Sequence, residues 1–168
     1  MPELFDVVDE QDRVLRRETR AEVHRQRLLH RAVHVLVFNP RGEVYLQRRS
    51  KHKDTYPLRW TTSCSGHVDA GEDYDTAVVR ELAEELGIKI PDVSALEKLL
   101  KYGPSRETGW EFIWVYTLTT EATPVPGPAE IAEGRWCTAE ELDAWMTREP
   151  KAFTPSFILV WKLWRKKN

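Results

Sequence analysis

The chain has 168 residues, of which 41% are hydrophobic and 31% charged, and its formal net charge is -2. This balance predicts one globular domain over residues 1–168 and no bulk attraction to nucleic acid or to an anionic membrane. Two cysteines do not make a disulfide framework. The acidic first segment does not resemble a signal peptide, and no apolar run approaches the length of a membrane span. We therefore expect a cytoplasmic protein.

Apolar periodicity predicts alternating strands and helices along the chain. In chain order, strands are expected at 4–9, 13–16, 30–39, 43–49, 61–65, 96–103, 109–119 and 130–137. Helices are expected at 18–29, at 73–86, after Thr138 and at 155–166. Residues 30–39 are almost wholly apolar, as in a strand that is buried on both faces. Glu141 completes a capping box with Thr138, and Gly87 is expected to end the helix at 73–86.

Three carboxylates share one face of the helix expected at 73–86. Glu81, Glu84 and Glu85 stand at positions i, i+3 and i+4, which lie together on a helix surface. Like charges so close repel one another, and a solvated acidic face is the ordinary alternative. A hard divalent cation removes the repulsion, because Mg²⁺ prefers carboxylate oxygens. The spacing therefore predicts a metal site formed by these three glutamates.

The segment 66–88 resembles the Nudix box, G-x5-E-x7-R-E-U-x-E-E-x-G-U with U apolar. Every fixed position is filled, by Gly66, Glu72, Arg80, Glu81, Leu82, Glu84, Glu85, Gly87 and Ile88. The resemblance implies an α/β/α sandwich with a mixed central sheet, and hydrolysis of a nucleoside diphosphate linked to another group. It also implies Mg²⁺ as the cofactor, or Mn²⁺, with the carbonyl of Gly66 among the metal ligands.

Other residues of the box are expected to shape the loop before the helix. Arg80 should clamp Glu72 and brace that loop, because a guanidinium can hold a carboxylate with two parallel hydrogen bonds. Gly66 and Gly71 should allow tight backbone turns beside the metal. Outside the box, Glu111 and Glu130 are candidates for the general base, with Glu133 a weaker one; each could equally be a surface glutamate.

Substrate contacts are less well defined by the sequence. His67 is expected in the site because it adjoins Gly66, and Lys51, Lys53 and Arg59 could bind phosphates. Aromatic side chains that could stack on a base are Trp110, Trp114 and Tyr102, although core placement is equally open. The expected partner is a small diphosphate, and the oligomeric state is left open.

Most of the chain resembles the branch of the superfamily that contains type I isopentenyl-diphosphate isomerase and its bacterial hydrolase-like neighbours. The resemblance is carried by residues 4–16, 28–39, 46–63 and 153–157. It implies a second metal site of histidines and glutamates: His30 and His67 fit it, His24 is one residue out of register, and Glu111 matches the catalytic glutamate. The second expected glutamate is Gly109, and the expected tryptophan is Ser156.

The isomerase also needs a cysteine directly before the Gly/Ser-His pair. Here that residue is Ser65, and Cys64 is one place earlier, which in a strand means the opposite face. Together with the intact box, these departures favour a hydrolase on an isomerase-like scaffold. An isomerase and a non-catalytic diphosphate-binding module are the alternatives.

Overall fold

The computed structural model describes residues 1–168, and its centre is a mixed sheet. Strand β3 (His30–Phe38) runs parallel to β8 (Glu111–Thr119), in register from His30 opposite Glu111 to Phe38 opposite Thr119. On its other side β3 pairs antiparallel with β6 (Cys64–His67). This register places the start of β3, the start of β8 and the end of β6 side by side.

Four more strands complete the seven-stranded sheet. They are β4 (Val44–Arg49), β5 (Trp60–Thr61), β7 (Glu97–Tyr102) and β9 (Ile131–Cys137). The main path is β5-β4-β3-β8-β7, while β6 pairs with β3 and β9 pairs with β4. All of these pairings are antiparallel except β3 with β8, so the sheet is mixed as predicted.

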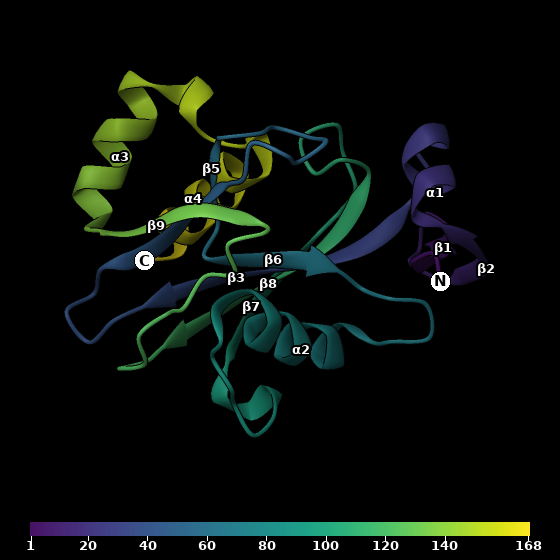
Figure 1. Cartoon of the computed structure of the whole chain (residues 1–168), viewed down its shortest axis with the longest axis horizontal. Helices are drawn as coiled ribbons and strands as arrows, with labels where there is room; N and C mark the ends of the chain where they lie inside the picture. Colours follow the sequence, from purple (N-terminus) through teal and green to yellow (C-terminus); the bar gives the residue numbers. More distant parts are fainter.

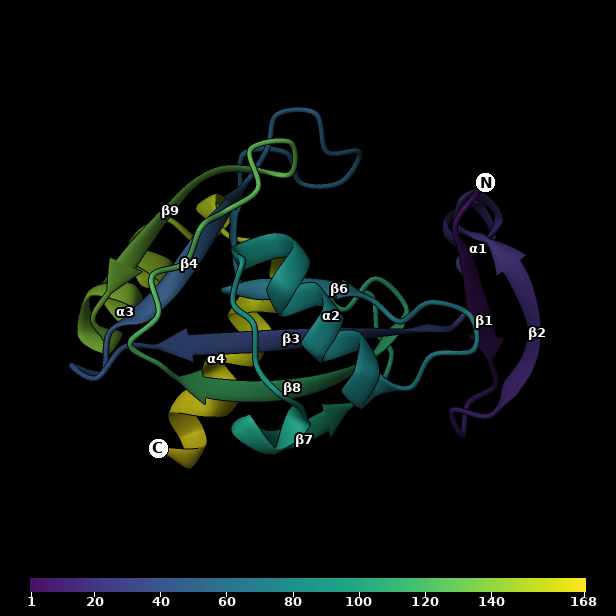
Figure 2. The same cartoon turned by 60° about the horizontal axis from the view of Figure 1, so that its bottom comes forward.

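Helices cover both faces of the sheet, as Figures 1 and 2 show. Helix α2 (Tyr74–Leu86) packs on one face, through a cluster that joins Val33 and Val35 of β3 to Leu82 and Leu86. Helices α3 (Ala139–Arg148) and α4 (Pro155–Lys167) pack on the other face, against Leu36 and its neighbours. The β3 strand is therefore buried on both sides, and the predicted α/β/α sandwich is confirmed.

The first 26 residues form a small unit at one end of the sheet, the right-hand end in Figure 2. Strands β1 (Leu4–Val8) and β2 (Val14–Thr19) make an antiparallel hairpin, and α1 (Arg20–Gln26) follows directly. Phe5 and Val7 of β1 pack with Val23 of α1 in a small buried cluster. This unit faces the end of β6, where the box begins.

Most element boundaries agree with the sequence prediction, and three elements differ. The single strand expected at 61–65 is divided between β5 and β6, which pair with β4 and β3 respectively. The helix expected at 18–29 is only Arg20–Gln26, because β2 extends to Thr19 and the Thr19 hydroxyl caps the helix. The loop expected at 66–72 begins two residues later, since Gly66 and His67 belong to β6. The capping box of Thr138 and Glu141 is present, and no helix has the length and apolar character needed to cross a membrane.

Candidate active site

Helix α2 carries the three glutamates of the box. Asp73 begins it by accepting a hydrogen bond from the Thr76 amide at 2.7 Å, and Gly87 ends it with φ of 65°. The apolar residues of the helix are buried against the sheet; Glu81 and Glu85 lie beside them and are partly buried, while Glu84 is exposed. All three line one large cavity, of about 980 Å³.

The Glu81 carboxylate approaches the backbone of Gly66 closely. A Cβ atom at Gly66 would collide with the carboxylate of Glu81, so a larger residue here would displace that side chain. Glu81 is nearly buried, with 12% of its side chain exposed. The Glu81 carboxylate therefore lies directly against the strand at Gly66, and carboxylate oxygens suit a hard cation.

Burial and the charge of a neighbouring carboxylate both raise the pKa of a glutamate. Burial raises the pKa of Glu81 to about 8, and the charge of Glu85 adds to the shift. Burial likewise raises the pKa of Glu85 to about 7, although its Oε1 accepts hydrogen bonds from the Ser65 amide at 2.9 Å and from Gln47 Nε2 at 3.2 Å. A bound cation would favour the ionised form of both groups, so the pair fits the predicted metal site.

Arg80 lies at the centre of the box. Its Nε and Nη2 donate to the two carboxylate oxygens of Glu72, each at 2.8 Å, so the predicted pairing is present. Nη1 donates to Glu81 at 2.8 Å and to Glu84 at 3.1 Å, and Nη2 also reaches the His67 carbonyl at 3.0 Å. One guanidinium thus joins the box loop, the end of β6 and the carboxylates of α2.

The N-terminal hairpin also holds the box loop, which sequence reasoning did not predict. The Ala70 amide donates to the Leu4 carbonyl at 2.9 Å, and the Gly71 amide donates to Asp6 Oδ2 at 2.9 Å. Gly71 has φ of 81°, a conformation that favours glycine, as predicted for a tight turn. The only signal for Asp6 was a carboxylate in an otherwise apolar strand, which by itself does not identify a partner.

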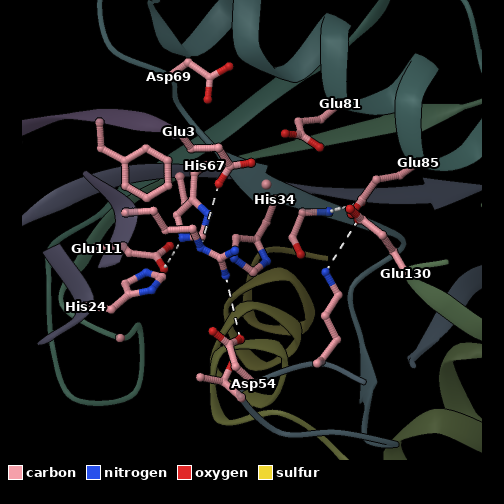
Figure 3. Close-up of a pocket in the computed structure, with 18 of the residues that line it drawn as sticks. Glu3, His24, His34, Asp54, His67, Asp69, Glu81, Glu85, Glu111 and Glu130 are labelled. Atoms are coloured by element: carbon pink, nitrogen blue, oxygen red, sulfur yellow. Dashed lines mark hydrogen bonds and ion pairs between the residues drawn. The ribbon is translucent and has the colours of Figure 1, made fainter. Parts of the chain in front are cut away.

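A second group of metal-ligating side chains lies at the other end of the cavity. One ligand atom each from His24, His30 and His67 lies within 4.8 Å of the others. Glu111 Oε1 is 3.5 Å from His30 Nε2 and 3.4 Å from His67 Nε2. Figure 3 shows His24, His67 and Glu111 turned toward one another. Helix α1, which packs against β1 and β2, supplies His24 despite its offset in sequence.

This cluster has the properties of a ligand set. His30 Nε2 is buried and has no hydrogen-bond partner, and Phe5 stacks on His67 with ring centroids 4.6 Å apart. Burial would raise the pKa of Glu111, but the histidines beside it lower that pKa overall. Burial lowers the pKa of His24 to about 4, which keeps its ring neutral and able to coordinate. The residues present therefore fit a divalent ion.

The remaining predicted site residues divide between the cavity and the outside. Glu130 lines the cavity just before β9 and lies 3.6 Å from Lys53 Nζ, which also lines it. Lys51 is exposed and outside the cavity lining. Arg59 lies over the ring of Tyr56 at 4.9 Å and donates to the Phe153 carbonyl at 3.5 Å, also outside the lining.

None of the three proposed stacking aromatics, Trp110, Trp114 and Tyr102, lines the cavity. Cationic residues that do line it, and that sequence reasoning missed, are Arg17, Arg20 and Arg49. Their position depends on how the hairpin and β4 meet the box, which local patterns do not encode.

The thiol and the serine before the box face opposite ways. Cys64 is fully buried in the core beneath α2, and burial raises the pKa of its thiol well above the usual range. Ser65 lines the cavity. The alternation predicted for this strand is confirmed, and no cysteine lines the cavity.

The fold and the box together define a Nudix domain, and comparison with known proteins gives the same result. Residues 28–157 match the family model of the NUDIX domain, and the chain belongs to this family. A crystal structure of a Deinococcus radiodurans protein superposes with a TM-score of 0.74 at 31% identity, covering 87% of this chain and 90% of that one.

Relatives in sequence carry two kinds of name. An isopentenyl-diphosphate Delta-isomerase of Nocardia farcinica is 38% identical over 155 residues, which cover 89% of this chain and 87% of the relative. A Nudix hydrolase of Deinococcus radiodurans is 34% identical over 140 residues, covering 83% of this chain and 81% of the relative. The family is thus established, while both reaction classes occur among the relatives.

Proposed function

We propose that this protein is a metal-dependent hydrolase that cleaves the diphosphate linkage of a nucleoside diphosphate joined to another group. The observation that carries the proposal is the complete set of Glu81, Glu84 and Glu85 lining one cavity, with Glu81 against the strand at Gly66. A module that only binds a diphosphate would not need three carboxylates that repel one another. Mg²⁺, or Mn²⁺, held by these glutamates and the Gly66 carbonyl, would neutralise the diphosphate and lower the pKa of the attacking water.

The chain's own residues would position both reactants. Arg20, Arg49 and Lys53 line the cavity and suit phosphate oxygens; Arg20 Nε is buried without a hydrogen-bond partner. Lys51 and Arg59 remain candidates for contacts only with parts of a substrate that extend beyond the cavity. Arg80 keeps the carboxylates in place through Glu72.

Glu130 is our choice for the general base. The Glu111 carboxylate lies between His30 and His67, whereas Glu130 has one long ion pair with Lys53, at 3.6 Å, and an exposed carboxylate. A base must reach the proton that it removes, and Glu130 lines the same cavity as Glu81 and Glu85. Figure 3 places Glu130 beside Glu85.

Isomerisation of isopentenyl diphosphate is the second candidate. It is favoured by the grouping of His24, His30, His67 and Glu111, and by the relatives that carry the isomerase name. It is opposed by Ser65 at the position where the isomerase needs a thiol, because the neighbouring Cys64 is buried outside the cavity lining. The complete box also favours hydrolysis.

The test is a product screen with Mg²⁺ or Mn²⁺ over nucleotide, sugar, coenzyme and isoprenoid diphosphates. We expect release of two phosphate-bearing products from at least one nucleoside diphosphate derivative. Incubation with isopentenyl diphosphate in deuterated water, followed by NMR, should show no allylic isomer and no deuterium at carbon. Isomerisation that Cys64→Ser abolishes would overturn the hydrolase assignment.

A further inference from the structure

His34 is a buried side chain that the proposed hydrolysis does not use. It belongs to β3, is 5% exposed, and lines the cavity. In Figure 3 it lies between the group of His24, His67 and Glu111 and the group of Glu85 and Glu130. It is separate from the three clustered histidines, which do not include it.

The contacts of Thr62 bear on which nitrogen of His34 is protonated. Thr62 Oγ1 is 2.9 Å from His34 Nδ1 and 3.3 Å from the Cys64 carbonyl oxygen, and the hydroxyl has one proton to donate. Both contacts are hydrogen bonds only when the hydroxyl donates to the carbonyl and Nδ1 donates to the hydroxyl, an arrangement that leaves Nε2 a free lone pair. Burial lowers the pKa of His34 to about 4, which agrees with a neutral ring at pH 7.

The Nε2 atom of His34 has no partner within the protein, since Thr62 is the only residue that bonds the ring. It is not among the fully enclosed atoms that lack a partner, so it opens toward the cavity. A buried acceptor of this kind gains most from a donor supplied by a bound molecule.

Hydroxyl groups line the same cavity. Thr154 Oγ1 donates to Thr61 Oγ1 at 3.0 Å and lies 3.4 Å from Ser156 Oγ. All three residues line the cavity, and Thr61 directly precedes the Thr62 that contacts His34. An apolar chain placed here would leave His34 Nε2 without a donor, whereas a hydroxylated group would supply one.

We propose that His34, Thr61, Thr154 and Ser156 form a subsite for a hydroxylated group attached to the diphosphate, such as a pentose, with His34 Nε2 accepting a hydrogen bond from one of its hydroxyls. The inference rests on the proposed function, because it assumes that the cavity binds a diphosphate. It goes further by naming the group that the cavity selects: a sugar, and not an isoprenoid chain.

Binding of non-hydrolysable analogues tests the subsite without turnover. Calorimetry in Mg²⁺ would compare α,β-methylene-ADP with its 2′,3′-dideoxy form, with methylenediphosphonate and with the isopentenyl ester of methylenediphosphonate. We expect the full-length protein to bind α,β-methylene-ADP about tenfold more tightly than the dideoxy form, which keeps the base and loses only the sugar hydroxyls. The isopentenyl analogue should gain nothing over methylenediphosphonate.

Variants then locate the effect. His34→Leu should remove the preference for the hydroxylated analogue, His34→Gln should retain part of it, and Ser156→Ala should weaken it. Binding of methylenediphosphonate should be unchanged in all three, which also reports that each variant is folded. Equal binding of the two nucleotide analogues, or tighter binding of the isopentenyl analogue, would overturn the subsite.

NMR provides a test that needs no ligand. In ¹⁵N-labelled protein, His34 Nε2 should give the chemical shift of an unprotonated imidazole nitrogen, and a hydrogen on Nε2 would overturn the proposal. The proposed hydrolysis and the proposed subsite can be disproved independently of each other. If nothing in the product screen is hydrolysed while the hydroxyl preference is present, the proposed reaction is wrong and the subsite stands.

Discussion

Arg80 donates two hydrogen bonds of 2.8 Å to Glu72, one from Nε and one from Nη2, although the two residues are eight positions apart in the sequence. The same guanidinium contacts Glu81 and Glu84 through Nη1. The box loop and the carboxylates of α2 are thus positioned by one side chain. A lysine at this position has no second donor in a fixed fork, so it cannot reproduce the arrangement.

We predict that Arg80→Lys and Glu72→Gln each lower kcat by on the order of a hundredfold, because a displacement of about 1 Å in a reacting group has an effect of that size. The double variant should be little worse than either single variant, since both break one interaction. Steady-state kinetics would measure the three variants. Arg25→Lys, in the exposed pair with Glu22, is the matched control and should leave kcat unchanged. Fully additive losses of kcat in the double variant would contradict the proposal that Arg80 positions the box loop through Glu72.

Glu84→Gln and Glu85→Gln should each remove most hydrolysis while leaving the protein folded. An amide is neutral and a poorer ligand for a hard cation than a carboxylate. In the metal-free protein, Glu85→Gln should leave the melting temperature unchanged or raise it, because the carboxylate is buried beside Glu81. Activity assays and thermal denaturation would measure both effects, with the exposed Glu121→Gln as control. Near-wild-type turnover in both variants would rule out the metal assignment.

The raised pKa values of Glu81 and Glu85 predict how metal-free stability depends on pH. Their folded-state pKa values of about 8 and about 7 exceed the usual 4.5, so the folded protein holds protons that the unfolded chain has released. Stability from these groups is present at low pH and is lost as the pH rises toward 8. His24 and His34 oppose this trend near pH 6.5, because the unfolded chain still binds protons at their usual pKa of 6.5 while the folded rings, with pKa values of about 4, do not. Their effect is smaller than that of the two glutamates, since most of the unfolded histidines have also lost their protons above pH 7.

In EDTA, the free energy of unfolding should therefore fall by on the order of 1 kcal/mol between pH 6.5 and 8. Added Mg²⁺ should stabilise the protein more at pH 8 than at pH 6.5, because protons and the cation compete for the same oxygens. Urea denaturation at both values of pH would measure this, and Glu85→Gln should flatten the metal-free dependence. A stability that rises across this interval would contradict the prediction.

The histidine cluster should bind one equivalent of a divalent transition metal, such as Mn²⁺ or Zn²⁺, independently of the glutamates. His24→Ala should abolish this binding and lower the melting temperature of the metal-loaded protein, because the ion would anchor the seven-residue α1 to the sheet. Metal analysis after dialysis would measure the stoichiometry. His52→Ala is the control, since His52 lies outside the cluster, and Glu84→Gln should leave this site loaded. Equal metal content in His24→Ala would contradict the assignment.

Sequence alone determined the features that depend on short-range periodicity. The helical repeat of about 3.6 residues puts Glu81, Glu84 and Glu85 on one face, and the twofold repeat of a strand separates Cys64 from Ser65. The buried strand β3, the ends of α2 and the Arg80–Glu72 pair follow from the same local rules, because their causes lie within about ten residues. The residues of the box could therefore be found in the sequence, and the family and the layered fold were implied by their resemblance to the Nudix pattern.

Only the tertiary structure revealed the contacts between residues that are far apart in the sequence. His24, His30, His67 and Glu111 come from α1, β3, β6 and β8. The pairing of β3 with β8 and with β6, together with the position of α1, brings them together. The Asp6 contact with Gly71 spans 65 residues, and the tautomer of His34 depends on Thr62, 28 residues away. Such contacts follow from how the sheet orders its strands and how the hairpin folds over them, and that order is set by the packing of the whole core, which no local periodicity contains.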